Sequence, residues 1–304
     1  MKRAMIWLFS NTKMTKLASF IWQLITSRHM KIALFVKAFF CASFGAAQAS
    51  DFSGKNEKPR VIVLTDISTS SGDPDDKQSL VRFLLYANEF DVEGLIATSA
   101  CSRRNSNPTG EPSPDEISER VEAYGKVLGN IRLDSNDYLS EEYLLGIIRK
   151  GMLTGRKPGS SSNANGWPVE EVIGEGKDTE ASNLIVQSLQ KKDDRPLWIC
   201  VWGGPMDLAQ ALWNLRKSHS WDELQQMLSR LRVYAWGNQE LGGQWIRDKF
   251  PELFYINSTG GISYSINPYL NSVNWLNTNI RKNHGPLGEL DKSIIFSMCC
   301  CCLY

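Results

Sequence analysis

Three carboxylates follow one apolar stretch of the chain at a spacing that can do chemistry. The run Val61-Ile-Val-Leu-Thr ends in Asp66, and Asp75 and Asp76 open a segment, residues 77–90, whose apolar side chains repeat with helical period. Carboxylates brought close together repel one another unless a cation or a hydroxyl-rich ligand holds them. Because hard oxygen ligands suit calcium or magnesium and not zinc, the cluster predicts a hard-cation or sugar site.

The acidic residues at the start of residues 77–90 also have a purely structural interpretation. Asp73 suits the N-cap of a helix, and Pro74 suits its first position. Asp75 and Asp76 then lie at the positive end of the helix dipole, where each charge contributes about 0.3–1 kcal/mol. Capping does not account for Asp66, which precedes the helix, so both interpretations stay open.

The elements that position these residues alternate along the chain. Apolar runs bounded by polar loops predict strands at residues 61–65, 94–98, 197–202 and 231–236, and helical patterns cover residues 77–90, 115–129, 140–150, 179–190 and 205–216. This alternation predicts an α/β fold, with a mostly parallel central sheet and helices on both of its faces. Asp66 then lies at the carboxyl end of a strand, where open α/β sheets place their ligands.

Two further loops end strands at the same edge of the predicted sheet. The glycines of Trp202-Gly-Gly-Pro-Met-Asp207 permit a strand-to-helix turn and a close approach of the backbone to a ligand. Asp207 equally suits the first turn of a helix that binds nothing. In the next loop, Asn238 and Glu240 carry groups that suit sugar hydroxyls, although such residues are also ordinary in exposed turns.

The order of these features resembles the start of the nucleoside hydrolase fold. A strand ends in Asp66, a loop leads to Asp75-Asp76 and a helix, and a second strand reads Glu93-Gly-Leu-Ile-Ala-Thr-Ser99. More narrowly, the chain resembles the nucleoside-hydrolase-like domain of secreted bacterial proteins known as cellulose-binding. The motifs that carry the narrower resemblance are Trp202-Gly-Gly-Pro-Met-Asp-Leu-Ala-Gln-Ala-Leu212, Trp245-Ile-Arg-Asp-Lys-Phe-Pro251 and Asn283-His-Gly-Pro-Leu-Gly288.

The resemblance implies calcium-dependent hydrolysis of an N-glycosidic or related glycosidic bond. Asp66 would bind calcium and accept a proton from the attacking water, and Asp76 would be a second metal ligand. Asp75 would hold a sugar hydroxyl, and a backbone carbonyl at Met206 or Asp207 would complete the protein's contribution. The alternatives are a non-catalytic protein that holds carbohydrate such as cellulose in the same pocket, and a product that does not fold.

Three departures from the family pattern weaken the implied calcium site. Leu64 stands where the hydrolase signature has a further Asp, and the loop from Asp66 to Asp75 is longer than the usual one. The family also places a ligand Asp beyond the motif of residues 283–288, where this chain retains only Asp291. Since calcium takes six to eight oxygens, a site that lacks one charged ligand should bind weakly.

The two ends of the chain carry patterns of their own. Residues 30–49 have a basic start, an apolar centre and the ending Ala47-Gln-Ala49, which predicts a cleaved signal peptide and a secreted or periplasmic protein with no stable membrane insertion. Residues 1–29 are interpreted as a misassigned start, the alternative being a long basic leader on an uncleaved anchor. Residues 50–58 are a predicted linker, and residues 59–290 are the predicted domain.

The tail of residues 291–304 departs abruptly from the family pattern. It ends in four adjacent cysteines, Cys299 to Cys302, a spacing that no tetrahedral zinc site uses. We interpret the tail as the product of a frameshift or early stop. The formal charge of the 304-residue chain is +1, without clustered basic residues, which argues against nucleic acid. The resemblance implies a sugar-containing small molecule or a polysaccharide as the partner.

Overall fold

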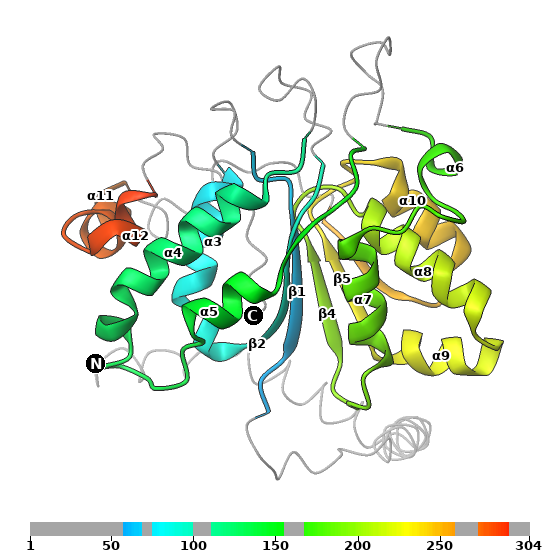
Figure 1. Cartoon of the computed structure of the whole chain (residues 1–304), viewed down its shortest axis with the longest axis horizontal. Helices are drawn as coiled ribbons and strands as arrows, with labels where there is room; N and C mark the ends of the chain where they lie inside the picture. Colours follow the sequence, from blue (N-terminus) through cyan, green and yellow to red (C-terminus); the bar gives the residue numbers. More distant parts are fainter. Residues whose placement is uncertain (1–56, 69–74, 100–110, 155–166, 259–272, 292–304) are drawn as a thin grey trace, which may run out of the picture. The chain divides into compact units, whose positions relative to one another are not determined.

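Apolar strands that alternate with amphipathic helices form one parallel sheet with helices on both faces (Figure 1). The structure, a computed structural model, describes residues 57–68, 75–99, 111–154, 167–258 and 273–291. The chain divides into two units, residues 1–57 and 58–304, and the sheet belongs to the second. The predicted leader, signal peptide and cysteine-rich tail lie outside the described residues, so they stay predictions.

Within the described residues the sheet has six strands in the order β3-β2-β1-β4-β5-β6, and each neighbouring pair is parallel. The strands are β1 (Arg60–Thr65), β2 (Asp91–Ala97), β3 (Ile148–Lys150), β4 (Leu197–Val201), β5 (Leu231–Ala235) and β6 (Phe254–Asn257). The prediction of an α/β fold with a mostly parallel sheet is confirmed.

Two hydrophobic cores lie on opposite faces of the sheet, because successive side chains of a strand point to opposite sides. On β1, Ile62 and Leu64 belong to one core, while Val61 and Val63 belong to the other. The first core is covered by α6 (Val169–Val172), α7 (Glu180–Gln190), α8 (Met206–Ser218), α9 (Trp221–Arg230) and α10 (Leu241–Lys249). The second is covered by α3 (Asp75–Leu85), α4 (Pro114–Ile131), α5 (Glu141–Gly146), α11 (Val273–Leu276), the π-helical turn η3 (Asn277–Arg281) and α12 (Gly285–Glu289).

One predicted helix is wrong in its second half. The helix expected over residues 140–150 ends at Gly146, and residues 148–150 form the edge strand β3. Ile147 and Ile148 continue the apolar spacing of Leu144 and Leu145, so the sequence pattern does not mark the change. The strand forms because its backbone pairs with β2 from Leu95 to Ala97, a contact between distant parts of the chain.

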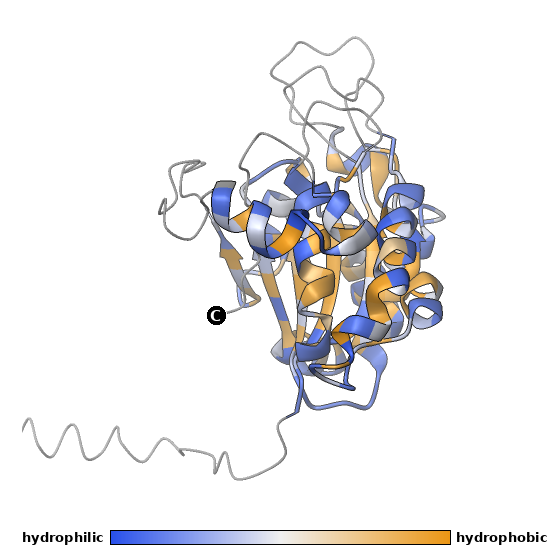
Figure 2. Cartoon of the chain, turned by 90° about the vertical axis from the view of Figure 1, so that its left-hand side faces the viewer, coloured by the Kyte–Doolittle hydropathy of each residue, from blue (hydrophilic) through white to orange (hydrophobic). Residues whose placement is uncertain are grey.

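On the second face of the sheet, β6 carries apolar side chains that the described residues leave partly exposed. Trp198, Arg232 and Phe254 lie side by side on β4, β5 and β6, and Tyr234 lies beside Ile256. Phe254 is 48% exposed and Ile256 is 40% exposed. Figure 2 shows this face, with apolar strands beside and behind its helices.

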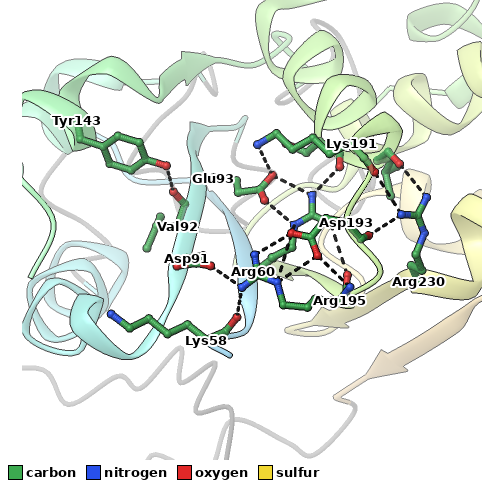
Figure 3. A network of polar contacts seen from close by, with 12 residues as sticks. Lys58, Arg60, Asp91, Val92, Glu93, Tyr143, Lys191, Asp193, Arg195 and Arg230 are labelled. Atoms are coloured by element: carbon green, nitrogen blue, oxygen red, sulfur yellow. Dashed lines mark hydrogen bonds and ion pairs between the residues drawn. The ribbon is translucent and has the colours of Figure 1, made fainter. Parts of the chain in front are cut away.

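A network of ion pairs joins the strands at their amino ends (Figure 3). Arg60 is buried, and its Nε donates to Glu93 at 2.6 Å, while Lys191 donates to the other oxygen of Glu93 at 2.9 Å. Hydrogen bonds from Arg195 lower the pKa of Asp193 to about 2. Burial alone would raise the pKa of Glu93, but the hydrogen bonds from Arg60 and Lys191 outweigh it and lower the pKa.

No helix among the described residues is long and apolar enough to cross a membrane.

Candidate functional site

The loops after β1 and β4 diverge at the middle of the sheet. From β1 the chain runs outward to β2 and β3, and it then returns to β4 on the other side of β1 before continuing to β5 and β6. Open α/β sheets bind ligands in the crevice that such a reversal leaves at the carboxyl ends of the strands. Asp66 follows β1 there, and Trp202-Gly203-Gly204 follows β4. We call this side of the sheet the carboxyl edge.

Gly203 and Gly204 make room for two predicted site residues. A Cβ atom on Gly203 would lie 2.5 Å from Cβ of Asp66, and one on Gly204 would lie 2.2 Å from a carboxylate oxygen of Glu240. Neither distance is tolerable for non-bonded atoms, so a side chain at either position would force Asp66 or Glu240 to move. Asp66 and Glu240 come from separate loops, and both lie against the turn after β4, Asp66 at Gly203 and Glu240 at Gly204.

The predicted cluster of Asp66, Asp75 and Asp76 forms at the start of α3. Asp75 and Asp76 lie in the first turn of the helix, and Asp76 is only 3% exposed. Burial, and after it the charges of Asp66 and Asp75, raise the pKa of Asp76 well above its usual value. The structure thus brings together the three carboxylates that the sequence placed in one loop.

The carboxylate of Asp76 has chemistry that fits a cation. Both of its oxygens are buried, and its side-chain contacts are with Asp66 and Thr65. Among the described residues no cationic side chain pairs with it. Helix capping explains an acidic residue in the first turn, but it does not explain a buried carboxylate without a cationic partner. Within the described residues, no group of three or more His, Cys, Asp or Glu side chains is placed to hold a metal. Asp66 and Asp76 would therefore supply only part of a calcium shell, and carbonyl, water and sugar oxygens would supply the remainder.

The side chain of Asp207 is occupied by protein donors. It lies in the first turn of α8, 1% exposed, and Oδ1 accepts a hydrogen bond from Oγ1 of Thr179 at 2.6 Å. The backbone N–H of Met152 points at both carboxylate oxygens, at 3.2 Å. Burial raises the pKa of Asp207 to about 6 even though these hydrogen bonds lower it. The predicted calcium contact of Met206 or Asp207 concerns a backbone carbonyl, and it stays a prediction.

The two predicted sugar-binding residues of the loop after β5 differ in their surroundings. Asn238 is exposed, whereas Glu240 is 2% exposed. Oε1 of Glu240 accepts a hydrogen bond from Oγ1 of Thr154 at 2.6 Å, and Oε2 is buried without a partner. Burial raises the pKa of Glu240 to about 8, so the group is an uncharged acid near neutral pH. Glu240 is thus a buried acid of the carboxyl edge, not a residue of an ordinary exposed turn.

Both buried acids are held by a segment that sequence reasoning did not single out. Residues 151–154 follow β3, at one edge of the sheet, and reach Asp207 through Met152 and Glu240 through Thr154. A Cβ atom on Gly151 would lie 2.3 Å from Oδ2 of Asp207, so this glycine also makes room for a carboxylate. No local pattern marks these residues, because their partners lie on the other side of β1 in the sheet.

Asp291, the residue that remains in place of the family's last ligand, already has a cationic partner. It is fully buried, and Nη2 of Arg281 donates to its Oδ1 at 3.1 Å. Burial raises the pKa of Asp291 by more than Arg82 and Arg281 lower it. The fold therefore gives this carboxylate a structural use beside η3 and α3.

Comparison with known families places most of the chain in one of them. Residues 60–298 match the family described as cellulose-binding Sde182, nucleoside hydrolase-like domain. The chain belongs to this family. The match extends beyond residue 290, the predicted end of the domain. The predicted resemblance to nucleoside-hydrolase-like, cellulose-binding proteins is confirmed.

A solved structure with a similar fold is that of a nucleoside hydrolase-related hypothetical protein from Saccharophagus degradans that is associated with carbohydrate metabolism. The two sequences are 31% identical and superpose with a TM-score of 0.66, over 80% of this chain and 52% of the other. This chain therefore spans about half the length of that protein. None of the curated proteins matches the chain.

Proposed function

We propose that the carboxyl edge is a hydrolase site that cleaves an N-glycosidic or related glycosidic bond in a sugar-containing small molecule. The observation that carries the proposal is the pair of Asp66 and Asp76 at the sheet's central reversal, with the carboxylate of Asp76 buried, its pKa raised, and no cationic side chain paired with it among the described residues. A buried carboxylate of this kind is costly unless a ligand compensates it. Calcium is the ligand that its hard oxygens suit.

The residues of the chain have separate roles in this proposal. Calcium, when bound, would supply the positive charge that offsets the clustered carboxylates and makes a water more acidic. Asp66 would accept the proton of the attacking water, and Asp75 would hold a sugar hydroxyl. Glu240, as an uncharged acid, would donate a hydrogen bond to the sugar through Oε2, and Asn238 would contact it from the rim. The negative field of Asp66 and Asp75 would favour the positive charge that develops on the sugar ring.

The proposal is tested with four proteins: the wild type, Asp66→Asn, Asp76→Asn and, as a matched control, Asp115→Asn on the exposed start of α4. Because the protein offers few charged ligands, we expect weak binding, and calcium should be present at about 10 mM, above the range of weak extracellular sites. Release of free sugar from purine and pyrimidine nucleosides is measured with calcium and with chelator. We expect slow, chelator-sensitive release by the wild type and Asp115→Asn, and a loss of about 100-fold in Asp66→Asn.

Thermal unfolding measures metal binding independently of catalysis. A ligand that binds only the folded state raises the melting temperature, so calcium should stabilise the wild type and Asp115→Asn. In Asp76→Asn the calcium response should disappear, while the melting temperature without metal should rise slightly because one buried charge is gone. An equal calcium response in the wild type and Asp76→Asn would contradict a metal site at Asp76.

A second candidate is a non-catalytic carbohydrate-binding protein. It is favoured by the description of the family as cellulose-binding. Hydrolysis requires calcium and releases free sugar, whereas binding alone requires no calcium and releases nothing. Retention on cellulose that survives chelator, together with no release of sugar from any nucleoside, would favour binding over hydrolysis.

A further inference from the structure

A cleft on the outer side of the helices lies apart from the carboxylate residues. It is formed by α6, α8 and α10, which lie side by side (Figure 1), and has a volume of about 460 Å³. Its lining residues are Glu170, Ile173, Trp213, Arg216, Trp245 and Lys249. Ligand pockets commonly have volumes of roughly 300–1,000 Å³, so the cleft is large enough for a small molecule or a short segment of polymer.

Two tryptophans give the cleft its apolar surface. Trp213 on α8 and Trp245 on α10 are half-buried, and both pack against the first hydrophobic core. The ring of Trp245 meets Phe250 edge-on, with 6.1 Å between ring centroids, and Nζ of Lys217 lies 5.2 Å from the centroid of Trp213. The rings are therefore held in place by the fold, so a ligand would not have to order them.

Charged side chains of both signs surround these rings. Glu170, Arg216 and Lys249 line the cleft, and all three are exposed. They offer hydrogen-bond donors and an acceptor around an aromatic surface. A nucleic acid strand would meet a carboxylate here, and a purely apolar helix would cover three charges. A sugar ring suits the cleft better, because its faces carry C–H groups and its edges carry hydroxyls.

We propose that this cleft binds a segment of a β-linked glucan chain, with sugar rings packed against Trp213 and Trp245 and hydroxyls bound by Glu170, Arg216 and Lys249. The site goes beyond the proposed hydrolysis, since none of these residues belongs to the carboxyl edge. Trp245 and Lys249 come from the motif Trp245-Ile-Arg-Asp-Lys-Phe-Pro251, which that activity does not use. A site of this kind would hold the protein on a polysaccharide surface while the carboxyl edge stays open.

The test measures binding of cellohexaose by the full-length chain, by titration calorimetry, and retention on insoluble cellulose. Trp213→Ala removes one ring, and the double variant Arg216→Ser/Lys249→Ser removes exposed charges without opening the core. Trp221→Ala is the matched control, since Trp221 is 53% exposed on α9 and does not line the cleft. Melting temperatures show that each variant is folded.

We expect Trp213→Ala and the double variant each to weaken cellohexaose binding by at least 10-fold, whereas Trp221→Ala and Asp66→Asn bind as the wild type does. Unchanged binding in the double variant would overturn the proposal. Loss of binding in Asp66→Asn, with binding kept in the cleft variants, would place the sugar at the carboxyl edge and also overturn it. Absence of cellohexaose binding by the wild type would also overturn the proposal. The proposed hydrolysis is tested separately, by sugar release from nucleosides.

Discussion

At the scale of single residues, the carboxyl edge contains buried acids that have no cationic partner among the described residues. Glu240 accepts a hydrogen bond from the hydroxyl of Thr154 and one from the backbone of Met206. Asp207 likewise has one hydroxyl donor, Thr179, and one backbone donor, Met152. Burial raises the pKa of Glu240 to about 8 and that of Asp207 to about 6. The charge of Asp207 adds to the rise at Glu240, so Glu240 is the acid that stays protonated near neutral pH.

We predict that Glu240→Gln stabilises the metal-free protein at pH 8 and has little effect at pH 5. The pKa of Glu240 is higher in the folded state than in the unfolded state, so its contribution to stability is complete below about pH 4.5 and is lost as the pH rises towards 8. Each unit of pKa difference corresponds to about 1.4 kcal/mol, so the loss at pH 8 should amount to a few kcal/mol. Gln keeps the oxygen that accepts from Thr154 but carries no charge.

Urea unfolding at the two pH values, in chelator, measures this effect. Exposed Glu122 on α4 provides the control Glu122→Gln, which should change stability equally little at both pH values. If Glu240→Gln is no more stable than the wild type at pH 8, Glu240 is not held as an uncharged acid.

At the scale of elements, the turn from β4 into α8 determines how closely the two halves of the site approach. A Cβ atom on Gly203 would meet the backbone nitrogen of Asp66 at 2.8 Å as well as its Cβ, and backbone cannot move aside as a side chain can. The three atoms nearest to a Cβ atom on Gly204 all belong to the carboxylate end of Glu240. The two glycines therefore have different tolerance to substitution.

We predict that Gly203→Ala destabilises the protein by about 1–3 kcal/mol, the usual range for overpacking, and that Gly204→Ala costs less. Both should reduce sugar release, because each displaces a site carboxylate. The control is Gly129→Ala on α4, where no atom lies within 4 Å of the new Cβ. There we expect a gain of about 0.5–1 kcal/mol from helix propensity. Chemical denaturation measures all three, and a Gly203→Ala protein as stable as the wild type would contradict the close approach.

The sequence predicted those elements whose pattern is local. The carboxylates Asp66, Asp75 and Asp76 come from one loop, and strand periodicity was enough to place them at the carboxyl edge. The strand β6 escaped notice, because Phe254-Tyr-Ile-Asn257 is short and its alternation is that of a half-covered edge strand. Thr154 could not be found either, since its partner Glu240 is distant in sequence and is reached only across the sheet. Contacts between strands that are not neighbours in the chain leave no local pattern.

At the scale of the whole molecule, the two ends of the strands respond to pH in opposite directions. We call the side of the sheet that carries the amino ends of the strands, with the ion pairs of Figure 3, the amino edge. At the amino edge, the lowered pKa values of Asp193 and Glu93 mean that their contribution is complete above about pH 4.5 and is lost as the pH falls. At the carboxyl edge, the raised pKa values of Asp76, Asp207 and Glu240 mean that stability is lost as the pH rises. The two edges therefore favour an intermediate pH.

We predict that the metal-free protein is most stable near pH 5 and that calcium moves the maximum towards neutral pH, because the cation favours the ionised carboxylates. Urea unfolding between pH 3 and pH 9, with chelator or with calcium, measures both curves. A chelator curve that is flat from pH 5 to pH 8 would show that the carboxyl edge carries no raised pKa values in the folded protein.

The pairing of β1 with β4 has a consequence for the timing of folding. β1 is the first strand of the sheet, yet the neighbour that completes its hydrogen bonding on one side is not made until residues 197–201 have been synthesised. Chains are synthesised from the N-terminus onwards, so β1, β2 and β3 can assemble early while one side of β1 has no hydrogen-bonding partner. During that interval a newly made chain exposes the free edge of its central strand to other chains. Asp66 then meets Gly203 only when the second half closes the sheet, so the site is one of the last parts of the molecule to form.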